Sequence, residues 1–131
     1  MRKRLLSLLL LSLYGSMLFA QEPLDINDVE RVPLGDFTYQ WRNIYDRTPL
    51  HGKCRIILSY RSYTIAHFNK DGILDGLYEK YEDNHLVQKL TYVKGILRGK
   101  GYEYYTDGTV KKECVWNEQG KIDGLMIEYN R

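Results

Sequence analysis

The chain has little of what marks several specialised classes of protein. Three prolines in 131 residues, together with 13% aromatic residues, exclude a disordered chain and a collagen-like chain. Basic residues exceed acidic residues only by 19 to 17, which argues against a dedicated nucleic-acid binder, because such a protein needs a concentrated basic face. The length allows one domain, or one short repeat array, with a modest hydrophobic core.

The sequence also lacks the motifs of common catalytic sites. It contains no glycine-rich phosphate loop, nucleophile elbow or zinc signature. His51, His67 and His85 have no spacing that suggests a shared metal, and we interpret them as surface or turn residues. We expect a protein that is not an enzyme and that has no cofactor or metal. Recurring carboxylates are interleaved with lysines, and we interpret them as surface charges: Glu79, Glu82, Glu103 and Glu128.

Residues 1–20 have the layout of a secretory signal peptide. Three cations at positions 2–4 precede an apolar stretch over residues 5–19, and Ala20 is the small residue at the expected cleavage point. The apolar stretch is shorter than the ~20 residues of a spanning helix, which disfavours the alternative of an uncleaved anchor. The signal indicates an exported protein, periplasmic or extracellular, with no stable membrane insertion after cleavage.

Pairs of glycines recur along the remaining chain. The two glycines of a pair are separated by three residues, and successive pairs are offset by 23 and 25 residues. A tyrosine follows the second glycine by five residues each time, at Tyr81, Tyr104 and Tyr129, and an earlier degraded copy keeps a glycine at its second position. Glycine supplies the positive φ that chain reversals need. The predicted turn glycines are Gly52, Gly72, Gly76, Gly95, Gly99, Gly120 and Gly124.

The segments between glycine pairs predict β-hairpins. Residues 77–82 and 86–93 are rich in Tyr, Leu and Val, and residues 101–105 and 109–116 flank an Asp-Gly pair, a strong hairpin signal. A lone hairpin is marginally stable, so successive hairpins are expected to pair edge to edge. The predicted fold is all-β: an antiparallel meander of repeated β-hairpins forming a single elongated twisted sheet.

The repeat register sets the expected domain boundaries. The β-repeat domain covers residues 36–131. Residues 37–41 alternate between aromatic and polar side chains and predict a strand that caps the first hairpin. Residues 21–35 show no periodicity, and we interpret them as a linker or extended arm. The expected repeats are about 48–71, 72–94, 95–119 and 120–131.

A glycine-x-x-x-glycine motif followed by tyrosine at this period resembles the MORN repeat, most closely its bacterial variant form. The segment YVKGILRGKGYEYYTDG carries the resemblance most clearly, and about three and a half copies cover residues 48–131. Similar bacterial chains are labelled YwqK family antitoxins of toxin–antitoxin systems. The resemblance implies an array of β-hairpins that binds and neutralises a partner protein without catalysing a reaction.

The two cysteines are expected to be free. Cys54 lies in the first strand of the first hairpin and Cys114 in the second strand of the third hairpin. Five strand steps of ~4.8 Å separate them by roughly 24 Å, whereas a disulfide needs Cα atoms within about 7 Å. We therefore expect two buried thiols that pack as small hydrophobes. The open alternative is a sheet curled enough to join them.

Aromatic residues supply the candidate binding surface. Twelve tyrosines against three phenylalanines indicate a sheet with one face partly wet. A row of wet tyrosines suits recognition, although cross-strand tyrosine ladders also stabilise a sheet that has no such function. The candidate binding-face aromatics are Tyr78, Tyr81, Tyr102, Tyr104, Tyr105, Trp116 and Tyr129.

These observations favour a secreted or periplasmic non-catalytic repeat module that binds a protein partner. One alternative is an antitoxin-like or immunity-like partner that neutralises an effector protein. Another is a carbohydrate-binding module that uses tyrosine and tryptophan platforms. A nucleic-acid partner is not expected, and the sequence indicates neither the identity of the protein partner nor the oligomeric state.

Overall fold

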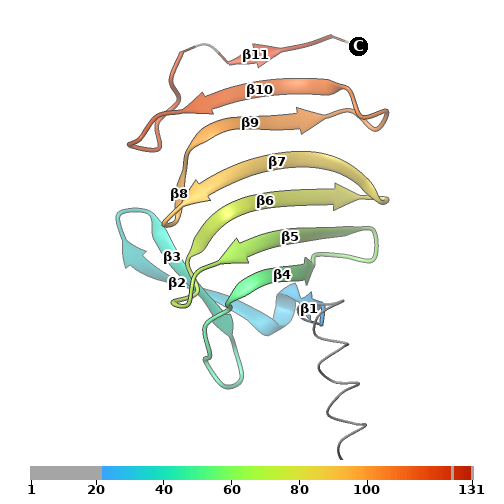
Figure 1. Ribbon diagram of the computed structural model, residues 1–131. Coiled ribbons are helices and arrows are strands. Elements are labelled where there is room, and N and C mark those ends of the chain that lie inside the picture. Colours follow the sequence, from blue (N-terminus) through green and yellow to red (C-terminus); the bar gives the residue numbers. More distant parts are fainter. Residues whose placement is uncertain (1–21, 125, 131) are drawn as a thin grey trace, which may run out of the picture.

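The computed structural model describes residues 22–124 and 126–130 (Figure 1). The predicted signal peptide at residues 1–20 lies outside this part of the chain. The described residues form strands and one short 3-10 helix. In chain order these are β1 (Leu24–Asp25), η1 (Ile26–Asp28), β2 (Val29–Gly35), β3 (Thr38–Asn43), β4 (Gly52–Ile57), β5 (Ser62–Phe68), β6 (Leu74–Glu82), β7 (His85–Val93), β8 (Ile96–Leu97), β9 (Gly99–Tyr104), β10 (Val110–Trp116) and β11 (Ile127–Glu128).

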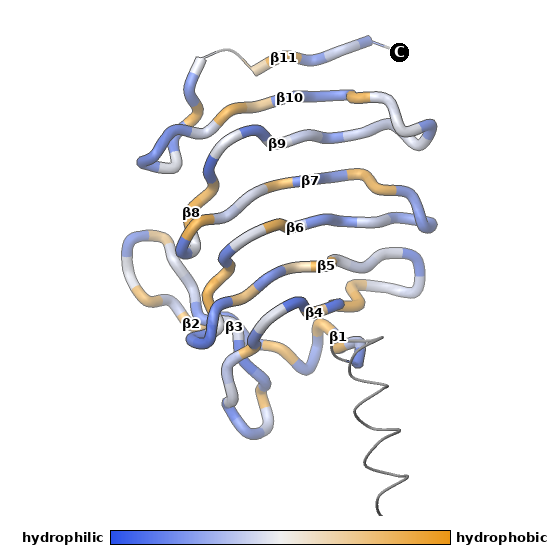
Figure 2. Tube along the Cα trace, viewed as in Figure 1, coloured by the Kyte–Doolittle hydropathy of each residue, from blue (hydrophilic) through white to orange (hydrophobic). Residues whose placement is uncertain are grey.

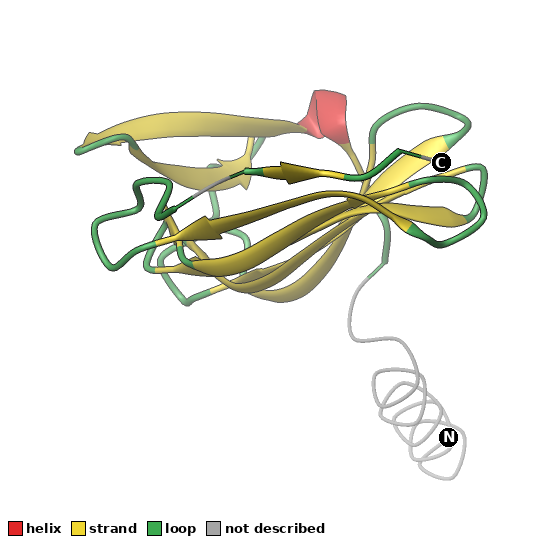
Figure 3. Ribbon diagram, turned by 90° about the horizontal axis from the view of Figure 1, so that it is seen from above, coloured by secondary structure: helices red, strands yellow, loops and turns green. Residues whose placement is uncertain are grey.

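The strands of the described residues form a nine-stranded sheet and a two-stranded sheet. The large sheet has the order β1-β4-β5-β6-β7-β9-β10-β11, and β8 pairs with the end of β7. Its neighbours from β4 to β11 are antiparallel, as expected for a meander of hairpins, and the all-β prediction is confirmed. Two details differ from the expectation. β1 joins β4 in parallel, and β2 pairs with β3 in a separate sheet over one face (Figure 3).

Asparagine fixes two of the loops that carry the first glycine of a repeat. The Asn69 side-chain oxygen accepts hydrogen bonds from the backbone N–H groups two and four residues further on, at 2.9 and 3.1 Å, and the Asn69 carbonyl accepts from Gly72 at 3.1 Å. Asn117 makes the same three contacts before Gly120, at 2.9, 3.1 and 3.0 Å. Both loops are therefore tight turns stabilised within their own sequence.

Consecutive repeats are packed through an isoleucine and a glycine. A Cβ atom on Gly95 would lie 3.0 Å from Cγ2 of Ile73, and a Cβ atom on Gly120 would overlap Cγ2 of Ile96. Each isoleucine directly follows the first glycine of its own repeat and lies over the first glycine of the next one. The seven predicted turn glycines also have positive φ, between 72° and 121°. The repeat register therefore serves both chain reversal and packing.

Residues 24–35 belong to the fold, which corrects the interpretation of residues 21–35 as a linker or arm. β1 pairs in parallel with β4 through Leu24 and Ile56, and η1 begins where the Asp25 carboxylate accepts the Asn27 N–H at 2.8 Å. Sequence pattern does not reveal this segment, because β1 is short and apolar residues stand on both faces of β2. Its pairing depends on contacts distant in the sequence.

The strand predicted at residues 37–41 has a different partner from the one expected. β3 does not cap the first hairpin, because β1 occupies the edge of β4. β3 instead lies across the face of the large sheet, where the Trp41 N–H donates to the Gly72 carbonyl at 2.7 Å and the Trp41 carbonyl accepts from Leu50 at 2.9 Å. These two backbone hydrogen bonds place the β2–β3 sheet on the repeat.

The hydrophobic core lies between the β2–β3 sheet and strands β4 to β6. The rings of Trp41 and Phe68 meet across this space with centroids 5.6 Å apart. Figure 2 shows apolar positions interspersed with polar ones along the strands, as expected for a sheet with one buried face. The buried cluster consists of Leu50, Cys54, Ile56, Ala66, Phe68 and Leu74.

Cys54 and Cys114 are both buried, and neither forms a disulfide within the described residues. Cys54 lies in β4 within the core, where burial raises the pKa of its thiol and so disfavours the reactive thiolate. Cys114 lies in β10, separated from β4 by β5, β6, β7 and β9. Among the described residues, no helix is long and apolar enough to cross a membrane.

We expect Gly72→Ala to destabilise the fold more than Gly99→Ala. Both substitutions place alanine at positive φ, where a non-glycine residue costs roughly 1–2 kcal/mol. A Cβ atom at position 72 would also overlap the Trp41 carbonyl oxygen, whereas one at position 99 meets no atom within 4 Å. Urea denaturation followed by tryptophan fluorescence measures both losses. Equal losses would contradict the backbone contact at Gly72, and a neutral Gly99→Ala would contradict the turn at Gly99.

Candidate functional site

The strand register divides the candidate aromatics between two faces of the large sheet. We call the face under the β2–β3 sheet the inner face and the opposite one the outer face (Figure 3). Tyr78 pairs with the core residue Ala66 and lies on the inner face, as does Trp116, whose ring would meet a Cβ atom on Gly101. The outer face carries Tyr81, Tyr102 and Tyr104. The structure therefore does not bring the predicted set together.

Tyr105 and Tyr129 lie near the β11 end of the sheet. The Tyr105 hydroxyl donates to the Tyr129 carbonyl at 2.8 Å, and the Lys111 ammonium lies 5.9 Å from the centre of the Tyr105 ring. Tyr129 is 43% exposed. These two residues anchor the last described segment to the loop between β9 and β10.

The outer face carries two stacked tyrosine pairs. Tyr63 and Tyr81 are cross-strand partners with ring centroids 4.9 Å apart and planes inclined by 12°, and the Arg55 guanidinium lies 4.1 Å from the centre of the Tyr63 ring. Tyr102 and Tyr104 stack with centroids 6.0 Å apart. All four side chains are half-buried, so each presents part of its ring to solvent. Tyr63 does not occupy the tyrosine position of the glycine repeat, so the sequence pattern does not reveal it. Only its cross-strand pairing with Tyr81 shows that it belongs to this surface.

Acidic neighbours and partial burial act on the outer tyrosines. The Tyr81 hydroxyl donates to the Glu79 carboxylate at 3.3 Å. Burial, reinforced by neighbouring Glu79, raises the pKa of Tyr81, and burial together with Tyr102 and Glu79 raises the pKa of Tyr104. Both phenols are therefore protonated near neutral pH, and Tyr81 keeps the proton with which it donates to Glu79.

The inner face contains a cleft at the border of the β2–β3 sheet. This aromatic cleft has a volume of about 600 Å³ and lies between β2–β3 on one side and β6, β7 and β8 on the other. Arg31, Tyr39 and Trp41 line it from the smaller sheet, and Tyr78 and Tyr92 line it from the larger one. Its volume falls within the range typical of small-molecule sites, about 300–1,000 Å³.

Two aromatic rings lie beside the Arg31 guanidinium in the aromatic cleft. Its central carbon lies 5.2 Å from the Tyr39 ring centre and 5.5 Å from the Trp41 ring centre. Across the cleft, Tyr78 and Tyr92 meet edge to face with centroids 6.0 Å apart. Arg31 is identified only by its pairing opposite Trp41 in the β2–β3 register. No local sequence signal distinguishes it from other exposed arginines.

Burial dominates the electrostatics of the two phenols on the sheet side. It raises the pKa of Tyr78 and of Tyr92, although the positive charge of Arg31 opposes the increase in both and a hydrogen bond from Thr64 opposes it in Tyr78. Both hydroxyls therefore keep their protons at neutral pH. The cleft combines neutral hydroxyls, apolar ring faces and a permanent positive charge.

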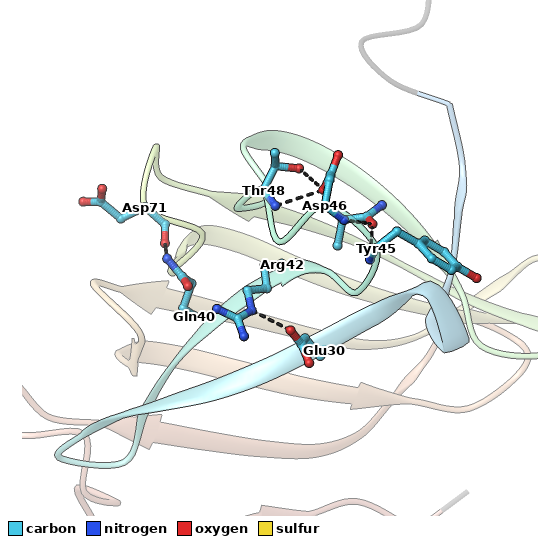
Figure 4. Close-up of polar contacts among 8 residues, drawn as sticks. Glu30, Gln40, Arg42, Tyr45, Asp46, Thr48 and Asp71 are labelled. Atoms are coloured by element: carbon cyan, nitrogen blue, oxygen red, sulfur yellow. Dashed lines mark hydrogen bonds and ion pairs between the residues drawn. The ribbon is translucent and has the colours of Figure 1, made fainter.

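Polar contacts hold the β2–β3 sheet over the inner face (Figure 4). Arg42 donates to Glu30 across the hairpin at 2.6 Å. The Gln40 side chain donates to the Asp71 carbonyl at 3.0 Å, next to the backbone contact between Trp41 and Gly72. The wall of the cleft that carries Arg31 is therefore fixed to the turn between β5 and β6.

A second, smaller hollow lies on the inner face near β10. It has a volume of about 200 Å³ and is lined by Leu90, Cys114, Trp116 and Met126, among others. Gly101 forms its floor, since a Cβ atom there would overlap the Trp116 ring and lie 2.8 Å from Leu90. Gly101 lacks positive φ, so its role is close packing, which the glycine register does not reveal.

The described residues contain no group of three or more His, Cys, Asp or Glu side chains that could hold a metal ion. His67 lies in β5 beside Gly76, where its Cβ would be 3.1 Å from an added side chain, and His85 begins β7. His51 precedes β4, with its carbonyl 3.6 Å from the Cys54 sulfur. The three histidines are thus on three different strands or loops.

Comparison with known proteins finds no match that establishes which family this chain belongs to. No family model matches the chain, and no curated protein matches it. Among solved structures, the crystal structure of TarM has a TM-score of 0.41 and 14% identity over 72% of this chain and 18% of its own. A second structure, a variant of S. aureus TarM with fondaparinux, alpha-GlcNAc-glycerol and UDP, has a TM-score of 0.29 and 13% identity over 72% and 16%. The chain thus spans less than a fifth of these proteins.

The free energy of unfolding is expected to fall as the pH rises above about 10, the ordinary pKa of tyrosine. The buried phenols have raised pKa values, so the unfolded chain loses these protons first and is favoured by alkali. Tyr92→Phe removes one such group and should give a shallower fall in urea denaturation between about pH 9 and 11. Tyr60→Phe is the matched control, because Tyr60 is 91% exposed. An unchanged slope for Tyr92→Phe would contradict the burial of its hydroxyl.

Proposed function

We propose that this protein is an exported, non-catalytic binding module whose outer face binds a protein partner. The observation that carries the proposal is the arrangement of Tyr63, Tyr81, Tyr102 and Tyr104 on one face. Their rings are stacked in two pairs and half-exposed, and the β2–β3 sheet lies against the opposite face. Tyrosine gives a large contact area for little loss of side-chain entropy, and stacking reduces that loss further.

Charged residues between the tyrosines favour a protein partner. The register places Glu79 opposite Lys89, and Lys89 opposite Tyr102, whose other neighbour is Glu113. Charges of both signs therefore alternate across the outer face, with Arg55 at one end. Aromatic residues and arginine surrounded by mixed polar groups are typical of protein interfaces.

The resemblance to MORN-variant repeats supports binding rather than catalysis, and the signal-like segment at residues 1–20 supports export. An antitoxin-like or immunity-like protein would be one form of the same function, with an effector protein as the partner.

Affinity purification from an envelope extract tests the proposal. A stoichiometric partner retained by the wild-type chain should bind at least tenfold more weakly to the Tyr81→Ala, Tyr104→Ala double variant, because tyrosine is enriched among the interface residues whose truncation costs about 2 kcal/mol or more. The control is Tyr45→Ala, since Tyr45 is 76% exposed and lies in the loop between β3 and β4. Circular dichroism establishes that each variant is folded.

Two outcomes would overturn the proposal. A partner retained equally by the double variant does not bind the outer face. If the Tyr45→Ala control weakens partner binding as much as the double variant does, the loss of binding is not specific to the outer face.

A further inference from the structure

We propose that the aromatic cleft of the inner face binds a sugar ring that carries a carboxylate, and that Arg31 binds the carboxylate. This site is separate from the outer face, because it opens between the β2–β3 sheet and strands β6 to β8. The argument rests on the charge of the cleft, its aromatic walls and its hydroxyl groups.

The charge of the cleft is positive and is not compensated at Arg31. Arg42 and Arg61 form ion pairs with Glu30 and Asp83, whereas Arg31 has no ion pair within the described residues. Arg31 is exposed, and its guanidinium lies against the Tyr39 and Trp41 rings.

Two further charged residues, Lys121 and Asp36, line the cleft, so cations exceed anions there by one. An exposed guanidinium that makes no ion pair keeps its N–H groups available for two parallel hydrogen bonds to a carboxylate. Charge and geometry both favour an anionic ligand.

The walls of the cleft match a sugar better than they match a simple ion. A sugar ring has an apolar face of C–H groups and a rim of hydroxyls. Trp41, Tyr78 and Tyr92 line the cleft with aromatic rings, and the phenols of Tyr78 and Tyr92 are protonated. A bare anion would leave the rings unused, and an apolar ligand would leave the hydroxyls and the charge of Arg31 unsatisfied.

The cleft is also rigid enough to select a ligand. The wall that carries Arg31 is held by the Arg42–Glu30 ion pair and by the Gln40 contact with the Asp71 carbonyl. The opposite wall is the central part of the large sheet. A site with two fixed walls loses little conformational entropy on binding, which favours a small ligand.

Titration calorimetry with the full chain tests the inference, using two disaccharides that differ by one group. Cellobiouronic acid carries a carboxylate, and cellobiose has a neutral hydroxymethyl group in its place. We expect the acid to bind at least tenfold more tightly than cellobiose or inorganic phosphate. Binding of cellobiose as tight as that of the acid would overturn the role of the charge. Phosphate binding as tight as that of the acid would show a simple anion site, and no heat with cellobiouronic acid would also overturn the inference.

Variants locate the site. Arg31→Gln should weaken binding of cellobiouronic acid at least tenfold, and Arg31→Lys should weaken it less, because lysine keeps the charge but loses the paired hydrogen bonds. Arg61→Gln is the matched control, since Arg61 is exposed and belongs to the loop between β4 and β5. Tyr92→Phe, which removes one hydroxyl, should weaken binding several-fold with no change in secondary structure.

The outer-face double variant Tyr81→Ala, Tyr104→Ala should bind cellobiouronic acid as the wild type does. This result separates the two proposals, because loss of the protein partner leaves the cleft intact. Equal weakening by Arg31→Gln and Arg61→Gln, or loss of sugar binding in the outer-face variant, would place the sugar elsewhere and overturn the inference.

Discussion

The backbone of Gly72 lies against the backbone of Trp41, and the position of the smaller sheet depends on this contact. The Gly72 carbonyl accepts the Trp41 N–H at 2.7 Å, and no side chain fits between the two segments. The contact sets Trp41 over Phe68 and so closes the hydrophobic core. It also sets Arg31, which pairs with Trp41, at the border of the aromatic cleft. A single turn of the repeat thus positions both the core and a candidate site.

The regular part of the fold could be predicted because its signals are local. Glycine pairs, the Asp-Gly turn and the alternating runs between them all lie within one repeat, and strands β6, β7, β9 and β10 follow from them. The segment of residues 24–35 could not be predicted in this way. β1 is stabilised by β4, some thirty residues away. β2 does not have one polar and one apolar face, because Val32 and Leu34 place apolar side chains on its second face as well. Long-range pairing leaves little trace in such short strands.

The candidate sites could be predicted only in part, for a related reason. Tyrosine abundance indicated an aromatic surface, but the assignment of each ring to a face requires the register of every strand. Register shifts between Lys80 and Tyr81, and between Ala66 and Phe68, change the alternation within a strand. Arg31 becomes a site residue only through its cross-strand neighbour Trp41. The spacing of residues along the sequence does not show which side chains become neighbours when two strands pair.

The two ends of the large sheet are not equivalent. At one end the parallel strand β1 interrupts the antiparallel alternation beside β4, and at the other β11 pairs with β10 through two residues, Lys112 and Glu113. Since the buried core cluster lies toward the β1 end, between β4 to β6 and the β2–β3 sheet, the array has a direction. In a repeat array each unit contacts only its neighbours, so a hairpin added beside β11 would leave the packing of the core cluster unchanged.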